Sequence, residues 1–446
     1  MDHQINKTGN RLKSVKVGIC GLGTVGSGTF KVLTDNADLL ALRLQANVCV
    51  THIGARRDNP DCPVGDVTVS RDIFDVARDP EVDILVELIG GTSVAKDLVE
   101  EAIRAGKHVV TANKALIAEC GNELFSLAEQ HKVVIRYEAA VAGGIPIIKA
   151  LREGLAGNRI HWLAGIINGT GNYILSEMRD KGRDFSDILA EAQALGYAEA
   201  DPAFDIEGTD AAHKLVILAA IAFGMPLQFS QVFTEGITRL TPQDMACAEE
   251  LGYRIKHLGV AKHSAKGVEL RVHPTLIPEQ QLLANVDGVK NAVLVEGDAV
   301  GPSLYYGAGA GAEPTASAVV ADIIDLARDL VVGQQPQLAG LGIKCAEIRA
   351  LPIVPMAEVE TPWYLRLESD DKPGVMSRVT SLLSAEGISI EALIQKAALP
   401  GETKVPVVVL TNAAAQGRLD KAVSAIEALD SISSDIMRIR VESLHA

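Results

Sequence analysis

The feature that most limits the possible folds is a glycine-rich turn that follows a short apolar stretch near the N-terminus. Residues 15–20 run directly into Gly21, Gly23 and Gly26, which are spaced as G-x-G-x-x-G, and a helical stretch follows. In this context the first glycine permits the tight turn, the second lets a pyrophosphate approach the backbone, and the third lets the helix pack close to the strand. The free N–H groups at the start of the helix attract phosphate. We therefore expect a dinucleotide-binding domain, the alternative being a glycine-rich turn in some other α/β protein.

Further strand candidates follow at the spacing of an α/β domain. Short apolar stretches cover residues 47–54, 82–89, 108–111 and 133–138, with a helical pattern over 94–105 between two of them. Alternating strands and helices of this kind indicate a parallel, doubly wound sheet. The fold class expected for the first part of the chain is therefore α/β, with a Rossmann domain.

The end of the second strand candidate bears on which nicotinamide cofactor fits. The sequence there is Gly54-Ala55-Arg56-Arg57. Sites that prefer NAD usually place an acidic residue at this point, whereas arginine suits the 2′-phosphate of NADP. Arg56 and Arg57 therefore favour NADP(H), although Asp58 beside them leaves NAD(H) open and the arginines can equally be solvated surface residues.

The pattern changes from about residue 160, and the chain divides into four regions. An apolar-striped helix over 314–330 is expected to return to the Rossmann sheet, which makes the first domain discontinuous. The expected boundaries are 1–155 for the NAD(P)-binding Rossmann domain, completed by about 312–345; 156–311 for an α/β substrate and dimerisation domain; 346–362 for a linker; and 363–446 for a compact tail. The tail orders its strands and helices as βαββαβ, which predicts a ferredoxin-like fold.

Charge and cysteine usage exclude several classes of protein. The formal net charge is −15 and there is no long basic run, which argues against nucleic acid or an anionic membrane as the main partner. The six cysteines include no C-x-x-C pair, so reduced thiols are expected. No secretory signal and no apolar run long enough to span a bilayer stand out. The sequence therefore predicts a cytoplasmic protein without a nucleic-acid or membrane partner.

The densest group of acidic residues lies between 196 and 214, ahead of a strongly apolar helix. Asp210 and Lys214 are four residues apart on this helix and so share one face. On spacing alone, a solvent-exposed salt bridge explains the pair. The apolar run after Lys214 favours burial, and a buried lysine held by carboxylates can donate a proton or bind a substrate alkoxide or carboxylate.

A second lysine follows a predicted sheet strand, in the run Thr111-Ala112-Asn113-Lys114. Open α/β sheets bind ligands at the carboxyl ends of their strands. Lys114 is therefore expected to reach a substrate beside the nicotinamide. The alternative is an ordinary lysine on a surface loop.

Together these motifs resemble those of homoserine dehydrogenases. The most specific match is Ala192-x3-Gly196-Tyr197-Ala198 followed by Asp201-Pro202-x2-Asp205-Ile206-x-Gly208-x-Asp210-x3-Lys214. The glycine turn and residues 87–91, 111–114, 138–146 and 307–315 are also similar to that family, in the same order. The tail resembles an ACT domain, including its Asp371-x-Pro373-Gly374 turn. The match covers essentially the whole chain and looks like the bacterial single-activity form.

The resemblance implies the reversible reduction of L-aspartate 4-semialdehyde to L-homoserine with NADPH or NADH, in threonine, methionine and isoleucine biosynthesis. Carried over by motif, Lys214 is expected to protonate the nascent alkoxide, and Lys114 to hold the substrate and assist. Glu199 and Asp210 are expected to bind the substrate, Glu199 at its ammonium group, with Asp205 in support. This suits the chemistry, because a cation near the oxygen stabilises the negative charge that hydride arrival builds there.

The same resemblance implies sites for the cofactor and for a monovalent cation. The residues expected to bind the cofactor are Gly21, Gly23, Thr24, Val25, Gly26, Arg56, Arg57, Gly91, Thr92, Lys114, Gly309 and Gly311. Sodium or potassium is expected at the Glu138 side chain and the backbone carbonyls near Val141, Gly143 and Ile145, since oxygen ligands suit a hard cation.

ACT domains commonly bind amino acids between paired copies, so the resemblance implies L-threonine as inhibitor and a homodimer or homotetramer. The alternative for the tail is a dimerisation module that has lost its ligand. Another amino-acid dehydrogenase would account for the glycine turn but not for the full signature over 192–214. An amino-acid sensor that binds nucleotide without turnover predicts loss of Lys114 or Lys214, and both are present. A DNA-binding regulator would need a basic helix-turn-helix, which is not visible.

Overall fold

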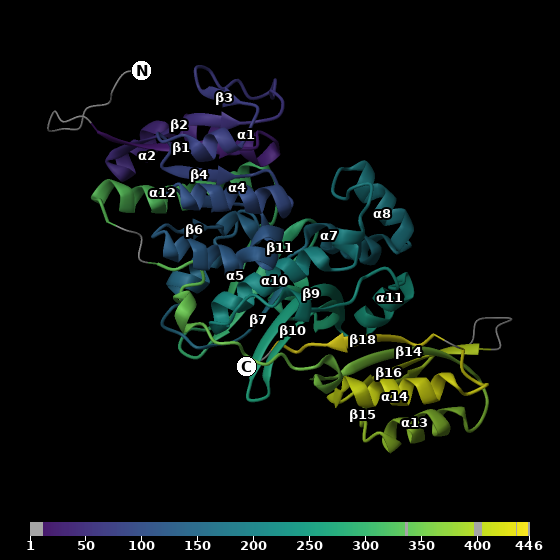
Figure 1. Ribbon diagram of the computed structural model, residues 1–446. Helices are drawn as coiled ribbons and strands as arrows, with labels where there is room; N and C mark the ends of the chain where they lie inside the picture. The colour runs from purple at the N-terminus through teal and green to yellow at the C-terminus, as the bar shows by residue number, and fades with distance from the viewer. Residues whose placement is uncertain (1–11, 335–337, 397–403, 434, 445–446) are drawn as a thin grey trace.

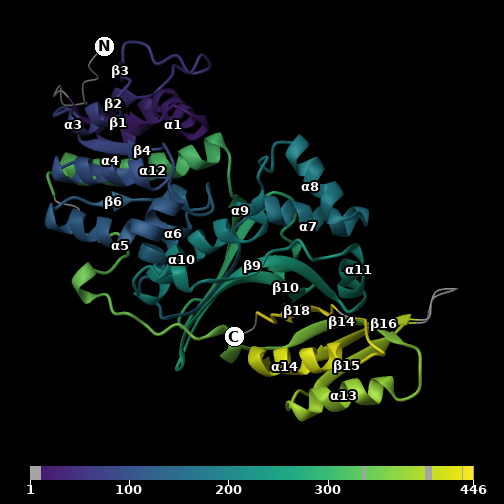
Figure 2. The ribbon, with the colours of Figure 1, turned by 45° about the vertical axis from the view of Figure 1, so that its right-hand side comes forward.

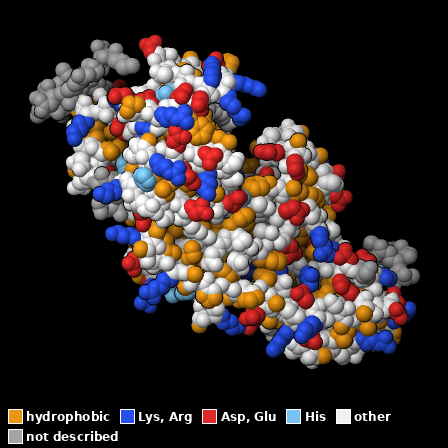
Figure 3. All heavy atoms as spheres, in the orientation of Figure 1, with side chains coloured by type: hydrophobic (Ala, Val, Ile, Leu, Met, Phe, Trp, Pro, Cys, Tyr) orange, Lys and Arg blue, Asp and Glu red, His pale blue; other side chains and the backbone are white. Residues whose placement is uncertain are grey.

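The computed structural model describes residues 12–334, 338–396, 404–433 and 435–444. A first sheet with its helices is followed by a second sheet with its helices, and a smaller α/β part lies at the C-terminal end (Figures 1 and 2). The face seen in Figure 3 carries acidic and basic side chains interspersed with one another. Within the described ranges, no helix combines the length and the apolar character needed to cross a lipid bilayer.

Six parallel strands form the first sheet, which confirms the predicted Rossmann domain. The strands are β1 Lys13–Cys20, β2 Ala46–Gly54, β3 Thr68–Ser70, β4 Ile84–Glu87, β5 His108–Thr111 and β6 Ile135–Arg136. They lie in the order β3-β2-β1-β4-β5-β6. Every residue of β4 and β5 is buried, as expected for strands covered by helices on both faces. The order reverses between β1 and β4, and dinucleotides bind at such a point.

The predicted strand over 133–138 is wrong at its end. Only Ile135–Arg136 is extended, and Glu138 begins a 3-10 turn. The Glu138 carboxylate accepts hydrogen bonds from the N–H groups of Ile148, at 2.9 Å, and Lys149, at 2.7 Å. The local apolar pattern cannot show these partners ten residues away, so the chain leaves the sheet earlier than the pattern predicts.

Helices cover the first sheet, and one of them comes from much later in the chain. The early helices are α1 Thr24–Asp35, α2 Ala37–Leu44, α3 Phe74–Arg78, α4 Ser93–Arg104 and α5 Lys114–Gln130. Helix α12, Ala312–Val332, lies against the first sheet and packs on α1 (Figures 1 and 2). A Cβ on Gly28 of α1 would lie 2.9 Å from the carbonyl oxygen of Ala312, so the two helices approach this closely only because Gly28 lacks a side chain.

The second sheet is antiparallel in its central part and carries its helices on one side (Figure 2). Its strands are β7 Ile160–Ile166, β8 Phe233–Thr234, β9 Tyr253–Ser264, β10 Gly267–Pro278, β11 Lys290–Gly297 and β12 Gly301–Ala308. The helices are α7 Gly169–Lys181, α8 Phe185–Ala194, α9 Ala203–Ile206, α10 Thr209–Phe223 and α11 Pro242–Glu250. Helix α10 is buried along most of its length because it contacts β9 and β10 on one side and α5 on the other.

The C-terminal part has the predicted ferredoxin-like order. Its elements are β14 Trp363–Asp370, α13 Val375–Ala385, β15 Ile390–Gln395, β16 Lys404–Thr411, α14 Gln416–Glu427 and β18 Met437–Val441. The four strands lie in the order β18-β14-β16-β15. All three contacts between neighbouring strands are antiparallel, which confirms the predicted βαββαβ, ferredoxin-like arrangement.

The sequence does not predict how this part is attached. Strand β18 also pairs in parallel with β10, with Thr275 opposite Arg440 and Leu276 opposite Val441. The ACT strands and the strands of the substrate domain therefore form one continuous sheet of ten strands. The last strand covers Met437–Val441, and residues before it hydrogen-bond back to the end of β14.

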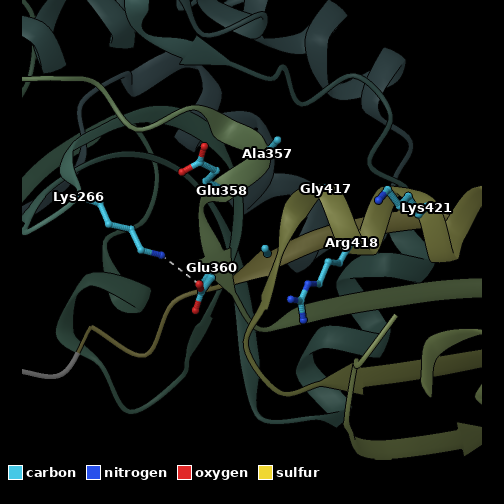
Figure 4. Close-up of a pocket in the computed structure, with 8 residues that line it drawn as sticks. Lys266, Ala357, Glu358, Glu360, Gly417, Arg418 and Lys421 are labelled. Carbon is cyan, nitrogen blue, oxygen red and sulfur yellow. Dashed lines mark hydrogen bonds and ion pairs between the residues drawn. The ribbon is translucent and has the colours of Figure 1, made fainter. Parts of the chain in front are cut away.

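The connector between the domains packs along the ACT domain rather than running free. A 3-10 turn, Met356–Glu358, leads into β13 Glu360–Thr361, which pairs with β17 Ala414–Ala415 at the start of α14. Figure 4 shows this turn beside α14, with Lys266 at the tip of the β9–β10 hairpin 3.2 Å from Glu360. The connector also hydrogen-bonds to Val268 of β10 through Pro352 and Val354, so it is tied both to the second sheet and to the C-terminal part.

Candidate active site

The glycine turn has the geometry that a dinucleotide requires. Gly21 has φ of 102°, a backbone conformation that favours glycine. A Cβ on Gly26 would lie 2.0 Å from the carbonyl oxygen of Gly21, so any other residue would force the helix away from the strand. A Cβ on Gly23 would meet no described atom within 4 Å, which leaves that side of the turn open to a pyrophosphate. Thr24 and Val25 begin α1, where backbone N–H groups lack partners within the helix.

One buried carboxylate joins the loops that follow β4 and β5. Glu87 is fully buried at the end of β4. Its carboxylate accepts hydrogen bonds from the N–H groups of Ile89, at 2.9 Å, and Gly90, at 3.1 Å. The hydroxyl of Thr111, at the end of β5, donates to it at 2.5 Å. These bonds fix both loops at the carboxyl edge of the sheet, beside the glycine turn.

The same edge holds Lys114 at the start of α5. Asn113 caps this helix, since its side-chain oxygen accepts from the N–H of Leu116 at 3.1 Å. Its side-chain amide donates to the Gly91 carbonyl at 2.6 Å. Thr92 occupies the corresponding cap position of α4. Lys114 is therefore positioned by the Rossmann loops and points out of that domain toward α10, as its contacts show.

Lys114 and Lys214 share one buried carboxylate. The Nζ atom of Lys114 lies 2.6 Å from Oδ1 of Asp210, and Nζ of Lys214 lies 2.7 Å from Oδ2 of the same residue. Lys214 also donates to the Ile167 carbonyl at 2.7 Å, and the Lys114 ammonium lies 5.4 Å from the centre of the Phe204 ring. Asp210 and Lys214 are both buried, so the exposed salt bridge considered from their spacing is wrong.

Sequence reasoning missed Asn168, which orders the acidic side of this cluster. Its side-chain amide donates to Oδ1 of Asp205 and to Oδ2 of Asp210, both at 2.8 Å. Its side-chain oxygen accepts from the N–H of Gly171 at 2.7 Å and so caps α7. The available signal was a polar residue directly after an apolar strand and before a glycine, the place where open sheets put functional side chains.

The charges of the cluster shift one another's protonation. Burial alone would raise the pKa of Asp210, but the ammonium groups of Lys214 and Lys114 outweigh burial and hold that pKa below its usual value. Burial, together with the positive charge of Lys114, lowers the pKa of Lys214 even though Asp210 opposes the shift. Burial and the neighbouring Asp210 raise the pKa of Asp205. A lysine whose pKa is lowered gives up its proton more readily, which suits a general acid.

Three of the predicted site residues are exposed, and none of them makes a hydrogen bond or ion pair with the cluster in the described part of the chain. Glu199 is exposed on the loop before α9. Arg56 and Arg57 are exposed just after β2. Asp58 forms an ion pair with Arg71 at 2.8 Å, so the acid beside the two arginines is already engaged by a third. The end of β2 thus keeps a net positive character.

The residues expected to hold a cation occupy one tight, buried turn. Glu138 is 2% exposed. Val141, Gly143 and Ile145 are buried, and Gly143 has φ of 51°. The Ile145 carbonyl accepts from the N–H of Ile147 at 2.8 Å. In the described part of the chain no hydrogen-bond donor reaches the carbonyls of Val141 and Gly143.

The glycine-rich loop before α12 packs on that turn. A Cβ on Gly143 would lie 2.5 Å from the carbonyl oxygen of Gly309. A Cβ on Gly309 would lie 2.1 Å from the side-chain carbon of the Asn291 amide, so the close packing on Asn291 by itself requires glycine at this position. Gly311, with φ of 118°, precedes the first residue of α12. The loop therefore lies between the substrate domain and the start of the helix that returns to the Rossmann sheet.

A Rossmann sheet with two lysines that share a buried aspartate beside its carboxyl edge defines a nicotinamide-dependent oxidoreductase. Residues 21–138 match the family model described as homoserine dehydrogenase, NAD binding domain, and residues 146–324 match that described as homoserine dehydrogenase. The ACT domain model matches residues 363–431. The chain belongs to the homoserine dehydrogenase family, whose members are NAD(P)-dependent oxidoreductases.

Two of the known proteins that this chain resembles match it over 97% of its length, and a third matches a shorter part. Homoserine dehydrogenase of Pseudomonas aeruginosa is 57% identical, over 97% of this chain and 100% of that protein. The crystal structure of a homoserine dehydrogenase from Thiobacillus denitrificans is 54% identical, covers 97% of this chain and 99% of that chain, and superimposes with a TM-score of 0.92. A hyperthermophilic archaeal homoserine dehydrogenase in complex with NADPH is 26% identical, covers 70% of this chain and 97% of that chain, and has a TM-score of 0.59.

Proposed function

We propose that this chain reduces L-aspartate 4-semialdehyde to L-homoserine, reversibly, with the Lys114, Asp210 and Lys214 cluster at the reacting carbonyl. The observation that carries the proposal is the position of this cluster, where two ammonium groups share a buried carboxylate beside the loop that follows β5. Membership of the family supports the substrate. A sensor that only binds nucleotide would have no use for a lysine buried beside a second ammonium group, since burial of charge is unfavourable.

In this proposal each residue of the cluster has a separate role. When bound, the nicotinamide supplies hydride to the substrate carbon or takes it away. Lys214 holds a proton at Nζ and donates it to the substrate oxygen as negative charge develops there. Lys114 brings a second positive charge to the same oxygen. Asp210 holds both ammonium groups, Asn168 holds Asp210, and Glu199 is the carboxylate that we assign to the substrate ammonium group.

The substrate assignment predicts a strong preference for an amino-acid aldehyde. Succinate semialdehyde has the same chain and carboxylate as L-aspartate 4-semialdehyde but lacks the ammonium group. We expect kcat/KM to be at least about 10²-fold lower for succinate semialdehyde, because a site built to bind a polar group is left with unpaired charge by the analogue. Steady-state rates with both aldehydes measure the ratio. Equal values of kcat/KM would rule out an amino-acid substrate.

We propose NADP(H) as the preferred cofactor, bound with its 2′-phosphate near Arg56 and Arg57. The engagement of Asp58 by Arg71 supports this, and so does the archaeal relative that binds NADPH. Replacing both arginines with alanine is expected to lower kcat/KM for NADPH by about 10–100-fold, the range for lost hydrogen bonds to a charged group. The value for NADH should change little.

A matched control distinguishes phosphate binding from a general charge effect. Arg104→Ala removes another exposed arginine, which pairs with Glu100 on α4. This variant should keep the NADPH-to-NADH ratio of the wild type. An equal loss with both cofactors in the Arg56/Arg57 variant would contradict the 2′-phosphate assignment.

We also propose a monovalent cation at Glu138 and the carbonyls of Val141, Gly143 and Ile145. Burial and the nearby Asp322 carboxylate raise the pKa of Glu138 to about 7, against the opposing effect of Arg152. Two of the carbonyls are buried without a donor in the described ranges. An all-oxygen ligand set of this kind fits sodium or potassium. The cation would brace the turn on which the Gly309 loop packs.

Removing sodium and potassium should therefore destabilise the enzyme as well as slow it. Exchange into buffer containing only tetramethylammonium is expected to lower the Tm by a few degrees and to lower kcat, with recovery on adding sodium or potassium chloride, because a ligand that binds the native state stabilises it. Lithium chloride at equal ionic strength controls for salt. Identical Tm and kcat in all three media would refute the site.

The ACT domain fits a regulatory role, and we propose that L-threonine binds it and inhibits the enzyme. The proposed assembly is a homodimer or homotetramer. Deleting the tail is a poor test of either point, because β18 completes the sheet beside β10. Point substitutions in the full chain are needed instead.

A further inference from the structure

The residue before Lys214 on α10 is a buried histidine that the proposed mechanism does not use. His213 is 3% exposed, and its Nε2 atom lies 3.1 Å from a carboxylate oxygen of Glu119 on α5. Because a carboxylate only accepts hydrogen bonds, the Nε2 atom carries the proton. The other ring nitrogen, Nδ1, is buried and has no hydrogen-bond partner among the described residues. Glu119 therefore fixes both the tautomer and the orientation of this ring.

The surroundings keep the His213 ring uncharged at neutral pH. Burial lowers the pKa of His213, and the positive charge of Lys114 acts in the same direction, against the carboxylates of Glu119 and Asp210. The ordinary pKa of histidine is about 6.5, so a lowered value leaves the ring neutral at pH 7. A neutral ring brings no charge to a substrate, and what it can contribute is packing and orientation.

The imidazole packs against two phenylalanine rings, one of which contacts Lys114. The ring centres of His213 and Phe204 lie 5.6 Å apart, with the ring planes inclined by 43°. Those of His213 and Phe229, in the 3-10 turn Phe229–Gln231, lie 4.2 Å apart. The Phe204 ring also lies 5.4 Å from the Lys114 ammonium group. A row of contacts thus runs from His213 through Phe204 to Lys114.

His213 also takes part in one of two polar contacts between α5 and α10. Lys114 and Glu119 lie five residues apart on α5, which belongs to the Rossmann domain. Asp210 and His213 lie three residues apart on α10, which belongs to the substrate domain. The Lys114 ammonium lies 2.6 Å from Asp210. The bond between Glu119 and His213 fixes the packing of the same two helices, and the position of Lys114 depends on that packing.

We propose that His213 is a positioning residue that holds the Lys114 ammonium group at the substrate oxygen, through the Phe204 ring and through the Glu119 carboxylate. This inference rests on the proposed role of Lys114 in reduction of the aldehyde. The Lys114 side chain is 34% exposed, and a long lysine side chain has many rotamers, so fixed neighbours are needed to hold it in one place. A misplacement of about 1 Å in a reacting group can cost about 10²-fold in rate.

The first test is His213→Leu in the full-length protein. Leucine keeps an apolar side chain beside the two phenylalanines but loses the flat ring and the bond to Glu119. We expect kcat to fall about tenfold, with KM for NADPH within twofold of wild type. The Tm should change by no more than a few degrees, because the Glu119 side chain is 40% exposed and stays hydrated when it loses its partner. A fall in Tm with unchanged kcat would assign His213 a structural role only.

A double substitution shows whether His213 acts through Lys114. In a Lys114→Met background there is no ammonium group left to position, so adding His213→Leu should lower kcat by less than twofold. Two residues that act through one contact are not additive, whereas independent residues are. A tenfold loss in both backgrounds would therefore overturn the proposal.

His263→Leu is the matched control. His263 lies on β9, and its ring centre is 5.7 Å from that of Phe223 at the other end of α10, but its side chain is exposed. This variant should keep kcat within twofold of wild type. A tenfold loss here would show that ring contacts with α10 affect turnover wherever they lie, which would contradict a specific role of His213.

Failure of this inference and failure of the proposed function give different results. Wild-type kcat in His213→Leu, together with a large loss in Lys114→Met, would overturn the positioning role alone. Wild-type kcat in Lys114→Met would remove the proposed role of Lys114, and the inference with it.

Discussion

Replacing Lys214 with methionine is expected to lower kcat by about 10²–10⁴-fold, the contribution that general acid–base groups make. The side chain donates to Asp210 and to the Ile167 carbonyl, both at 2.7 Å, and in the proposed mechanism it carries the proton that the substrate oxygen receives. Asp210 keeps a partner in the variant, because Lys114 lies 2.6 Å from its other oxygen. The fold and the binding of NADPH, followed by fluorescence, should therefore persist.

A second buried lysine, Lys256, provides a control that distinguishes a loss of catalysis from a loss of stability. Lys256 is 1% exposed, and its Nζ lies 2.7 Å from Oδ1 of Asp287 and from the Val286 carbonyl, an arrangement similar to that of Lys214 but in the interior of the substrate domain. Lys256→Met should reduce stability and leave kcat within a few-fold of wild type. If Lys214→Met retained wild-type kcat, or if both variants lost activity to the same extent, Lys214 would have no role in proton transfer.

Replacing Glu442 with alanine is expected to reduce the free energy of unfolding by about 3–5 kcal/mol, the usual cost of removing one partner of a buried ion pair. Glu442 follows β18 and is 4% exposed. Its carboxylate lies 2.6 Å from Arg271, which is 1% exposed on β10, and 2.7 Å from Lys262 on β9. Glu269 remains 3.0 Å from Arg271 in the variant, so the lower end of that range is expected.

The pH dependence of the Glu442 contribution follows from its surroundings. Burial alone would raise the pKa of Glu442, but Arg271 and Lys262 outweigh it and hold that pKa below the usual value. A carboxyl group whose pKa is lower in the folded state stabilises the fold above its unfolded pKa of about 4.3, and this contribution is lost as the pH falls through the folded value. The difference between wild type and Glu442→Ala should therefore be complete at pH 7 and shrink below about pH 4.

Chemical denaturation at several pH values measures this difference, with Glu360→Gln as the control. Glu360 pairs with Lys266 at 3.2 Å, and both side chains are about 60% exposed, so its loss should cost less than about 1 kcal/mol. Equal stability of Glu442→Ala and Glu360→Gln at pH 7 would show that the tail is not anchored through Arg271.

Features that depend on neighbours in the chain could be predicted from the sequence. The glycine turn predicted the dinucleotide-binding edge, because each glycine meets a local steric demand, as the 2.0 Å approach of a Cβ on Gly26 to Gly21 illustrates. Spacing of four residues placed Asp210 and Lys214 on one helix face, and the apolar run after them correctly favoured burial. The βαββαβ order of the tail followed from alternation and periodicity in the same way.

Features that depend on residues far away in the chain could not be predicted from the sequence. Asn168 binds Asp210 across 42 residues of sequence, and no local pattern reveals that contact. The pairing of β18 with β10 joins segments more than 160 residues apart, since Arg440 lies opposite Thr275, and such registers are set by packing rather than by either strand alone. Glu199 shows a different limit: its motif is clear, yet its side chain is exposed, so no contact in the structure identifies its role.

The measurement that tests the central claim most directly is nicotinamide absorbance with purified protein, L-aspartate 4-semialdehyde and NADPH or NADH, in buffer that supplies sodium and potassium. We expect rapid oxidation with wild type, faster with NADPH, with L-homoserine formed in equal amount and a rate about 10²–10⁴-fold lower for Lys214→Met. No oxidation with either cofactor, from folded wild-type protein, would contradict the account and favour a protein that binds nucleotide without turnover.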